Sequence, residues 1–270
     1  MAAHHEGDDM TSSTWLRWSV VALATWQILA AALSQTGVLP GEDVGAISDR
    51  YDSWIDPAGY AFSIWGLIYA ASLVLAVYQV SAARAKDTAL TGIRLPVALA
   101  FLCNGVWIIA FQQEQFVAAQ VVIVVLTASL AVAYATLARR GRPAGVAQRW
   151  IVFTTVGVYL GWATVATVAG TSTTLLAEGV TDVGLATGVW AALALIVATL
   201  LAVGVTVAGP PEPGFPLATA WGLAAIAVEQ GAQRPVVGAL AAGGAALALV
   251  ALGWREAQWQ RRGGAVAQRS

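Results

Sequence analysis

The sequence predicts an all-α membrane protein with eight spanning helices. Three observations indicate this fold: an apolar composition, repeated long apolar stretches and the placement of the basic residues. Hydrophobic residues make up 58% of the 270-residue chain and charged residues only 11%, with a mean hydropathy of +0.70. These values fall outside the usual balance of a soluble globular domain. We therefore expect a lipid bilayer to surround most of the chain.

Apolar stretches recur along the chain between short polar breaks. A hydrocarbon core about 30 Å thick is crossed by roughly 20 apolar residues in a helix. The stretches that meet this requirement are residues 18–37, 59–80, 95–111, 116–137, 150–170, 183–208, 215–230 and 235–254. The seventh is the shortest, so re-entrant insertion remains an alternative to a full span there. Residues 1–14 form a polar tail that we expect to be disordered.

Basic residues predict the orientation of the helices, because lysine and arginine near helix ends collect on the cytoplasmic side. The segments after the second and fourth stretches and the tail 255–270 are basic, with Arg84, Lys86, Arg94, Arg139, Arg140, Arg142, Arg149, Arg255, Arg261, Arg262 and Arg269. The alternate connections are acidic, with Glu42, Asp43, Asp49, Asp52, Asp56, Glu114, Glu178 and Asp182. Eight spans keep both termini cytoplasmic, whereas seven would export the basic tail. Arg234, and a sixth connection without a basic residue, fit this pattern less well. We expect a multi-pass protein of a bacterial cytoplasmic membrane.

Several functions are excluded or disfavoured by residues that the sequence lacks. No lysine follows Lys86, so no amine is available for a retinal Schiff base in a late helix. No ionisable residue lies near the centre of a predicted span, which disfavours ion-driven transport. Cys103 is the single cysteine, so neither an intramolecular disulfide nor a cysteine metal site is expected. Patches suited to nucleic acid are also absent.

Aromatic residues recur at one helical spacing in the second, third and fifth stretches. Residues at i, i+3 and i+7 share one face of a helix. The three sets are Phe62, Trp65 and Tyr69, then Asn104, Trp107 and Phe111, then Tyr159, Trp162 and Ala166. Three such faces predict a flat-walled pocket for a large conjugated or polycyclic ligand. Ordinary packing between helices is the alternative that spacing leaves open.

At these residues the chain resembles the tryptophan-rich sensory protein family, also called the translocator protein or peripheral benzodiazepine receptor family. The second-helix motif of the family is matched at Pro57, Phe62, Trp65 and Tyr69, with departures at Ala58 and Tyr60. The third-helix motif is matched at Asn104, Trp107 and Phe111. The fifth-helix motif is matched at Tyr159, Leu160, Trp162 and Ala166, with departures at Val165, Ala169 and Gly170.

The resemblance implies a five-helix bundle over residues 15–170, with additional helices over residues 171–254. It also implies a pocket for porphyrins and other hydrophobic ligands such as sterols, with no required cofactor. Carried over residue by residue, the pocket consists of Phe62, Trp65, Tyr69, Asn104, Trp107, Phe111, Tyr159 and Trp162. The loop 39–57, with Tyr51, Trp54 and Pro57, is the expected lid, and a solvated acidic connector is its alternative. Because the departures at 165, 169 and 170 all bring smaller side chains, we expect a wide pocket.

We therefore expect a membrane sensor or regulator for a tetrapyrrole-like or sterol-like ligand. The first alternative is a facilitator for a small hydrophobic solute, for which Pro96, Pro216 and the break at 209–214 are the only support. The second is a light-dependent porphyrin-degrading enzyme, although no acid, base, nucleophile or metal constellation supports catalysis. Small-residue spacings at Gly157 and Gly161 and at Gly184 and Gly188 predict close helix packing and leave a homodimer open.

Overall fold

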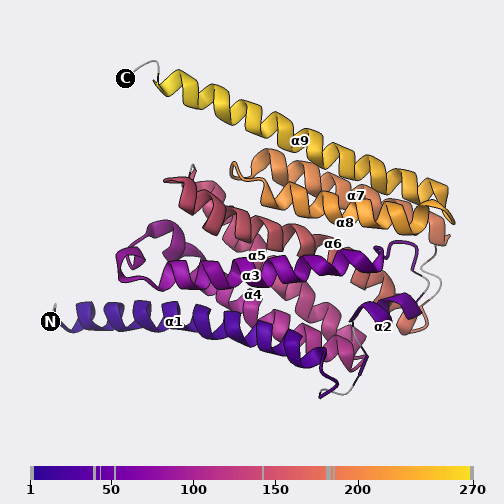
Figure 1. The fold of residues 1–270 in the computed structure, drawn as a ribbon, viewed down its shortest axis with the longest axis horizontal. Helices are drawn as coiled ribbons and strands as arrows, with labels where there is room; N and C mark the ends of the chain where they lie inside the picture. Colours follow the sequence, from indigo (N-terminus) through magenta and orange to yellow (C-terminus); the bar gives the residue numbers. More distant parts are fainter. Residues whose placement is uncertain are drawn as a thin grey trace.

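The computed structural model describes residues 3–38, 41–42, 44–51, 53–141, 143–180, 184 and 186–267, and helices are the only regular secondary structure within them. Within these described residues, nine α-helices follow one another (Figure 1). They are α1 (Ala3–Ser34), α2 (Val44–Arg50), α3 (Ile64–Val80), α4 (Thr88–Gln112), α5 (Phe116–Arg140), α6 (Thr154–Ala177), α7 (Thr187–Ala208), α8 (Gly214–Gly231) and α9 (Pro235–Ala267). Short turns of other helix types are η1 (Gly59–Ser63), η2 (Ala82–Arg84) and η3 (Gln148–Phe153). This all-helical bundle confirms the predicted fold class.

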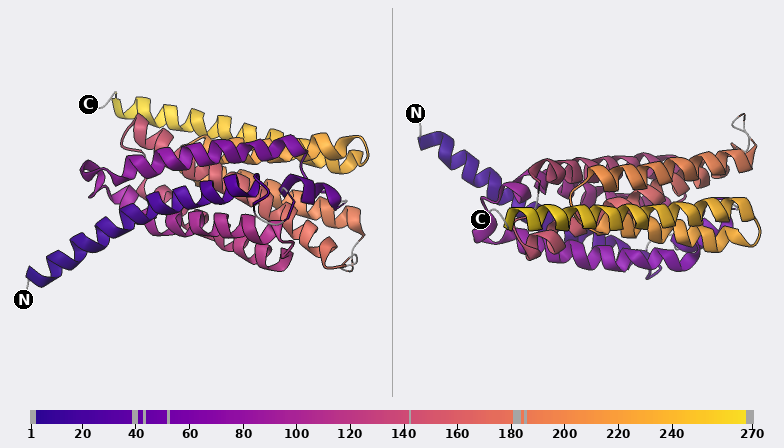
Figure 2. Two further views of the ribbon diagram at one scale, coloured as in Figure 1. Left: turned by 60° about the horizontal axis from the view of Figure 1, so that its bottom comes forward. Right: turned by 90° about the horizontal axis from the view of Figure 1, so that it is seen from above.

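The long helices run back and forth along one common direction. Helix α4 packs against α1 and α5, and α6 packs against α5 and α8, while α9 packs against α7 and α8. The first turn of α1 and the last turn of α9 lie at the same end of the bundle in every view (Figures 1 and 2). We call this end the terminal end, and the opposite end, where α2 lies, the loop end.

Seven helical segments of the described chain are long and apolar enough to cross a membrane, in agreement with a polytopic bundle. Helix α8 corresponds to the seventh predicted stretch and is not among them. It nevertheless runs beside α7 and α9 in the opposite direction to both (Figure 1). Much of its surface is buried against other helices, including Phe215, Ala218, Leu223 and Ile226. Since neighbouring protein covers α8, its sequence needs less apolar surface than a helix that faces lipid.

Helix α8 approaches α6 closely because glycines lie at the contact. A Cβ atom added at Gly161 would lie 2.5 Å from the backbone oxygen of Phe215. One added at Gly222 of α8 would lie 2.8 Å from a methyl group of Val165. The predicted close helix packing is therefore confirmed at Gly161, whereas the near neighbour of Gly157 is the Glu212 side chain in the connection between α7 and α8. The prediction for Gly184 is wrong, because Gly184 precedes α7 and has a φ of +77°.

Two other predictions differ from the structure. Arg94, which we expected in a cytoplasmic connection, lies inside α4 and is only 2% exposed. Its guanidinium donates hydrogen bonds to the Gln79 side chain at 3.0 Å and to the Arg84 backbone oxygen at 3.0 Å. The buried guanidinium therefore supplies hydrogen-bond donors to polar groups in the last turn of α3 and in the segment after it. In addition, α1 begins at Ala3, within the stretch for which we expected disorder.

Basic residues gather at the terminal end. The connections and helix ends there carry Arg84, Lys86, Arg139, Arg140, Arg149, Arg255 and Arg261. Within the described residues of the loop end, Arg50 and Arg234 are the basic side chains. Arg50 is paired there with Glu42 at 3.4 Å and with Glu114 at 2.7 Å. The bundle thus has one strongly basic end and one end where acidic residues outnumber basic ones.

Candidate functional site

Trp65 of α3 lies at the centre of an aromatic network that joins three helices. Its ring centroid is 5.6 Å from that of Trp107 on α4 and 5.7 Å from that of Tyr69, one turn along α3. Tyr159 and Trp162 of α6 meet it edge-on, with centroids 6.0 and 6.1 Å away. These distances and angles are those of favourable aromatic pairs. The three predicted aromatic faces therefore converge.

The network continues toward the loop end. Phe62 meets Trp162 edge-on at 5.9 Å, and Phe111 lies 5.5 Å from Trp107. Phe111 in turn contacts Phe116 of α5 at 5.4 Å. The phenol hydroxyl of Tyr159 donates a hydrogen bond of 2.9 Å to the side-chain oxygen of Gln27 on α1. Helix α1 thus contacts the aromatic network through this hydrogen bond.

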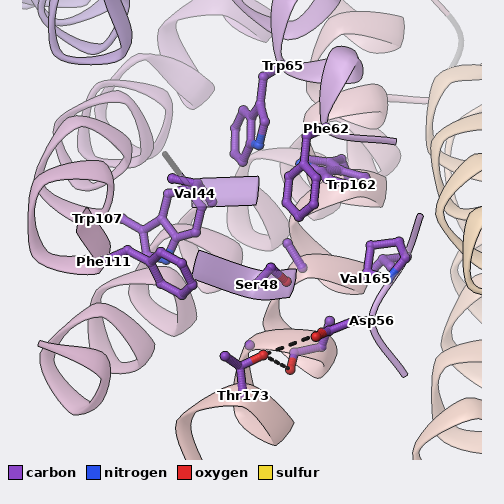
Figure 3. Close-up of a pocket in the computed structure, with 14 residues that line it drawn as sticks. Val44, Ser48, Asp56, Phe62, Trp65, Trp107, Phe111, Trp162, Val165 and Thr173 are labelled. Atoms are coloured by element: carbon purple, nitrogen blue, oxygen red, sulfur yellow. Dashed lines mark hydrogen bonds between the residues drawn. The ribbon is translucent and has the colours of Figure 1, made fainter. Parts of the chain in front are cut away.

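A small cavity lies between this network and the segment that follows α1. Its volume is about 30 Å³, which is room for little more than one water molecule. Aromatic rings gather on one side of it, and the polar side chains of Ser48, Asp56 and Thr173 lie on the other (Figure 3). The Thr173 hydroxyl donates a hydrogen bond of 3.4 Å to a carboxylate oxygen of Asp56. The cavity therefore has an apolar side and a polar side.

The structure brings six of the predicted residues to the cavity and leaves the other five outside its lining. Five predicted pocket residues and one predicted lid residue line the cavity, namely Phe62, Trp65, Trp107, Phe111, Trp162 and Pro57. Tyr69, Asn104 and Tyr159 do not line it, and two of them, Tyr69 and Tyr159, contact Trp65. Tyr51 and Trp54 do not line it either. Tyr51 packs edge-on against Phe116 at 5.4 Å, and Trp54 lies under the guanidinium of Arg234 at 4.9 Å.

Helix α2 supplies two lining residues that sequence reasoning missed. Val44 and Ser48 face the cavity from this short helix, which the apolar stretches did not reveal (Figure 3). Their spacing of four residues on one helical face was the only available signal. Part of the expected lid, including residues 39, 40, 43 and 52, lies outside the described residues.

The expectation of a wide pocket is wrong for this structure. Val165, Ala169 and Gly170 do line the cavity, as the small side chains at these positions suggested. However, Val44, Ser48 and Pro57 occupy the space beside them, which leaves the volume of about 30 Å³. Pockets for drug-sized ligands have volumes of roughly 300–1,000 Å³. A tetrapyrrole can enter only if α2 and the segment around Pro57 move.

Segment 53–58, which we call the lid segment, is held mainly by α8. The Ala58 backbone N–H donates to the Ala225 backbone oxygen at 3.2 Å. The side-chain amide of Gln230 donates to the backbone oxygens of Ser53 and Asp56 at 3.3 and 3.2 Å. Ile55 is 1% exposed and packs in a second hydrophobic cluster together with residues of α7, α8 and α9. The C-terminal helices therefore keep the lid segment in place over the cavity.

Two buried polar side chains of the site lack hydrogen-bond partners among the described residues. One is the indole N–H of Trp162, a cavity-lining residue that is only 1% exposed. The other is the amide of Asn104, one turn before Trp107 on α4, which is fully buried. A buried donor without a partner costs free energy. The indole N–H is therefore a group that an acceptor on a bound molecule could satisfy.

Comparison with known proteins agrees with this arrangement. Neither the curated proteins nor the solved structures give a match to the chain. The model of one family, described as TSPO-like protein, matches residues 15–254. The match begins in α1, extends through α7 and α8 and ends within α9. With its three converging aromatic faces and this match over most of its length, the chain belongs to the TSPO-like protein family.

Proposed function

We propose that this protein binds a flat hydrophobic ligand, of the porphyrin or sterol kind, and acts as a membrane sensor or regulator. The observation that carries the proposal is the aromatic network around Trp65, which lies within helices apolar enough to span a bilayer. Broad rings at these angles offer stacking surfaces to a planar molecule.

In this proposal, ligand binding acts as a signal by displacing the lid segment. The cavity is about 30 Å³, so a large ligand stabilises only a state in which α2 and residues near Pro57 have moved. A ligand that binds one of two states shifts the population toward it. Because α8 holds the lid segment, the shift reaches the C-terminal helices. Binding in the core is thereby coupled to a change at the loop end.

The polar side of the cavity suggests how such a ligand would be oriented. Asp56 and Thr173 lie toward the loop end, and the unpaired indole N–H of Trp162 lies near the rings. A ligand with an apolar ring system and a polar edge would place its rings against Trp65 and Trp107. Its polar edge would then face Asp56 and Thr173, where it can take part in hydrogen bonds.

The charge distribution supports a cytoplasmic location for the terminal end. Basic residues of connections face the cytoplasm in most multi-pass proteins, and seven such residues lie at this end. We infer a bacterial cytoplasmic membrane with both termini inside, as the sequence predicted. A homodimer is compatible with this arrangement. Measuring the molecular mass of the purified protein in detergent tests whether it forms.

Protoporphyrin titration of the detergent-purified protein tests the proposal. Binding is followed by tryptophan quenching and by the porphyrin absorption band. Trp107→Ala and Trp162→Ala should each weaken binding about tenfold, since each loses a stacking surface. Trp15→Ala is the matched control, because Trp15 is 71% exposed and distant in sequence from the network. No saturable binding, or equal weakening by all three substitutions, would contradict the proposal.

Ligand flux into sealed vesicles separates a sensor from a facilitator. The vesicles contain the purified protein, and porphyrin uptake is compared with that of protein-free vesicles. We expect binding without an increase in flux. A flux that requires Trp107 and Trp162 would favour the facilitator.

A further inference from the structure

A groove much larger than the aromatic cavity lies on the outer surface between α3 and α8. Its volume is about 600 Å³, against about 30 Å³ for the cavity. Leu67 and Ala71 of α3 form one wall, Leu217 and Trp221 of α8 form the other, and residues of α6 form the floor. Among the described residues, none that lines the groove also lines the aromatic cavity. The groove is therefore a separate site.

The packing of α6 explains why the groove exists. Helix α8 lies close to α6 because of Gly161 and Gly222, and α3 packs on another side of α6. The two helices thus flank α6 without covering the face between them. Toward the loop end the groove is closed, because the Trp221 indole N–H donates to the Ala61 backbone oxygen at 3.1 Å. Toward the terminal end it reaches Trp150, which is 53% exposed.

The surroundings of the groove point to a lipid chain as its occupant. Both α3 and α6 belong to segments apolar enough to cross a membrane, so the groove lies at the depth of the hydrocarbon. Its walls expose Leu67 by 58% and Leu217 by 48%. Water in such a groove would find few hydrogen-bond partners. An acyl chain, in contrast, contacts both walls and the floor at once.

Basic residues at the open end of the groove favour a lipid with an anionic headgroup. At this end, the guanidinium of Arg149 lies 5.7 Å from the ring centroid of Trp150. Arg149 is also paired with Glu256, but the terminal end as a whole is strongly basic, with Arg84, Lys86, Arg139, Arg140 and Arg255. Basic residues at a membrane surface attract anionic lipids by about 1 kcal/mol each, or roughly fivefold in affinity. An indole N–H at this depth can also donate to lipid oxygens.

We propose that the groove binds one acyl chain of an anionic phospholipid, whose phosphate lies beside Trp150 and Arg149 at the terminal end. The lipid fills the gap between α3 of the first five spans and α8 of the C-terminal helices. It therefore joins these two parts of the bundle in a place where few of their own side chains meet.

Native mass spectrometry of the purified protein tests this proposal. The delipidated protein is incubated with an equal mixture of phosphatidylglycerol and phosphatidylcholine that carry identical oleoyl chains. We expect one retained phospholipid per chain, with the anionic lipid preferred at least about fivefold. Ala71→Trp and Leu217→Trp place an indole in the groove from opposite walls and should each abolish retention. Leu73→Trp is the matched control, since Leu73 is exposed on α3 but does not line the groove.

The headgroup is tested by a second pair of variants. Arg149→Gln should lower the preference for the anionic lipid about fivefold, whereas Arg50→Gln, at the opposite loop end, should not. Four results would overturn the proposal: no retained lipid, no headgroup preference, retention unchanged in both filled variants, or a dimer that Ala71→Trp dissociates. The last would assign the groove to a second copy of the chain. Protoporphyrin binding is unaffected by any of these results, because the cavity shares no residue with the groove.

Discussion

Asn104 is a buried amide whose oxygen and nitrogen both lack hydrogen-bond partners among the described residues. It is fully buried on α4, where the family resemblance places it in the ligand pocket. Leaving buried polar atoms unpaired costs about 1–3 kcal/mol, whereas an apolar side chain of similar shape has no such cost. In the ligand-free protein the unpaired amide is therefore a source of instability.

Asn104→Leu should raise the melting temperature of the ligand-free protein in detergent. An effect of 1 kcal/mol corresponds to roughly 2–4 °C for a chain of this size. Gln112→Leu is the matched control on the same helix, because the Gln112 amide donates to the Ser34 backbone oxygen at 2.9 Å. The control should lower the melting temperature. If both variants melt earlier than the native protein, Asn104 has a partner in the folded state and our interpretation is wrong.

At the scale of elements, the contact between α8 and the lid segment is held by few polar groups. Gln230 is 3% exposed and bridges the backbone oxygens of Ser53 and Asp56. Its removal leaves two carbonyl groups without this donor and should loosen residues 53–58 without unfolding α8. Gln230→Ala should therefore speed amide hydrogen exchange in the lid segment, as measured by mass spectrometry. Gln233→Ala, one turn away and exposed, should not.

The connection between α7 and α8 contains a second buried polar group, Glu212, which is 2% exposed. Its carboxylate accepts hydrogen bonds from the Tyr134 hydroxyl at 2.8 Å and from the backbone N–H groups of Gly214 and Phe215. These donors lower its pKa, as does the charge of Arg149, but burial has the larger effect and raises the pKa from 4.5 to about 8. The folded state thus retains a proton that the unfolded state loses.

This difference predicts that the protein is less stable at high pH. Between pH 4.5 and about 8, the unfolded chain has released the Glu212 proton and the folded chain still holds it. Stability from this group is full below pH 4.5 and is lost as the pH rises through about 8. Glu212→Gln should reduce the fall in melting temperature over this range, whereas Glu178→Gln, on an exposed turn, should leave it unchanged. An identical pH profile for native protein and Glu212→Gln would contradict the prediction.

The long elements were predictable from sequence, and the short ones were not. All eight apolar stretches correspond to helices, because lipid and helix packing both require long apolar runs. Helix α2 has only seven residues and lies outside any such run, so no periodic signal revealed it. The aromatic faces were predictable because Phe62, Trp65, Trp107 and Trp162 each follow a helical spacing. The closed cavity was not, since its closure depends on contacts of the lid segment with α8, about 170 residues further along the chain.

For the whole molecule, the position of α8 decides the topology. It is less apolar than the seven candidate spans, yet it returns the chain from the terminal end to the loop end (Figure 1). With α8 crossing the membrane, the connections at 113–115 and 232–234 and residues 178–180 after α6 all share one side. If α8 were re-entrant, the 232–234 turn would lie on the opposite side from Glu178, and the basic tail would be exported.

Cysteine labelling distinguishes these two arrangements. The buried Cys103 is first replaced by serine, and single cysteines are introduced as Lys86→Cys, Glu178→Cys and Gln233→Cys. In spheroplasts with a sealed cytoplasmic membrane, a membrane-impermeant maleimide should label the cysteines at 178 and 233. The cysteine at 86 should react only after the membrane is permeabilised, because its basic surroundings favour the cytoplasmic side. Labelling of 178 without 233 would show that α8 does not cross, and labelling of 86 alone would invert the proposed orientation.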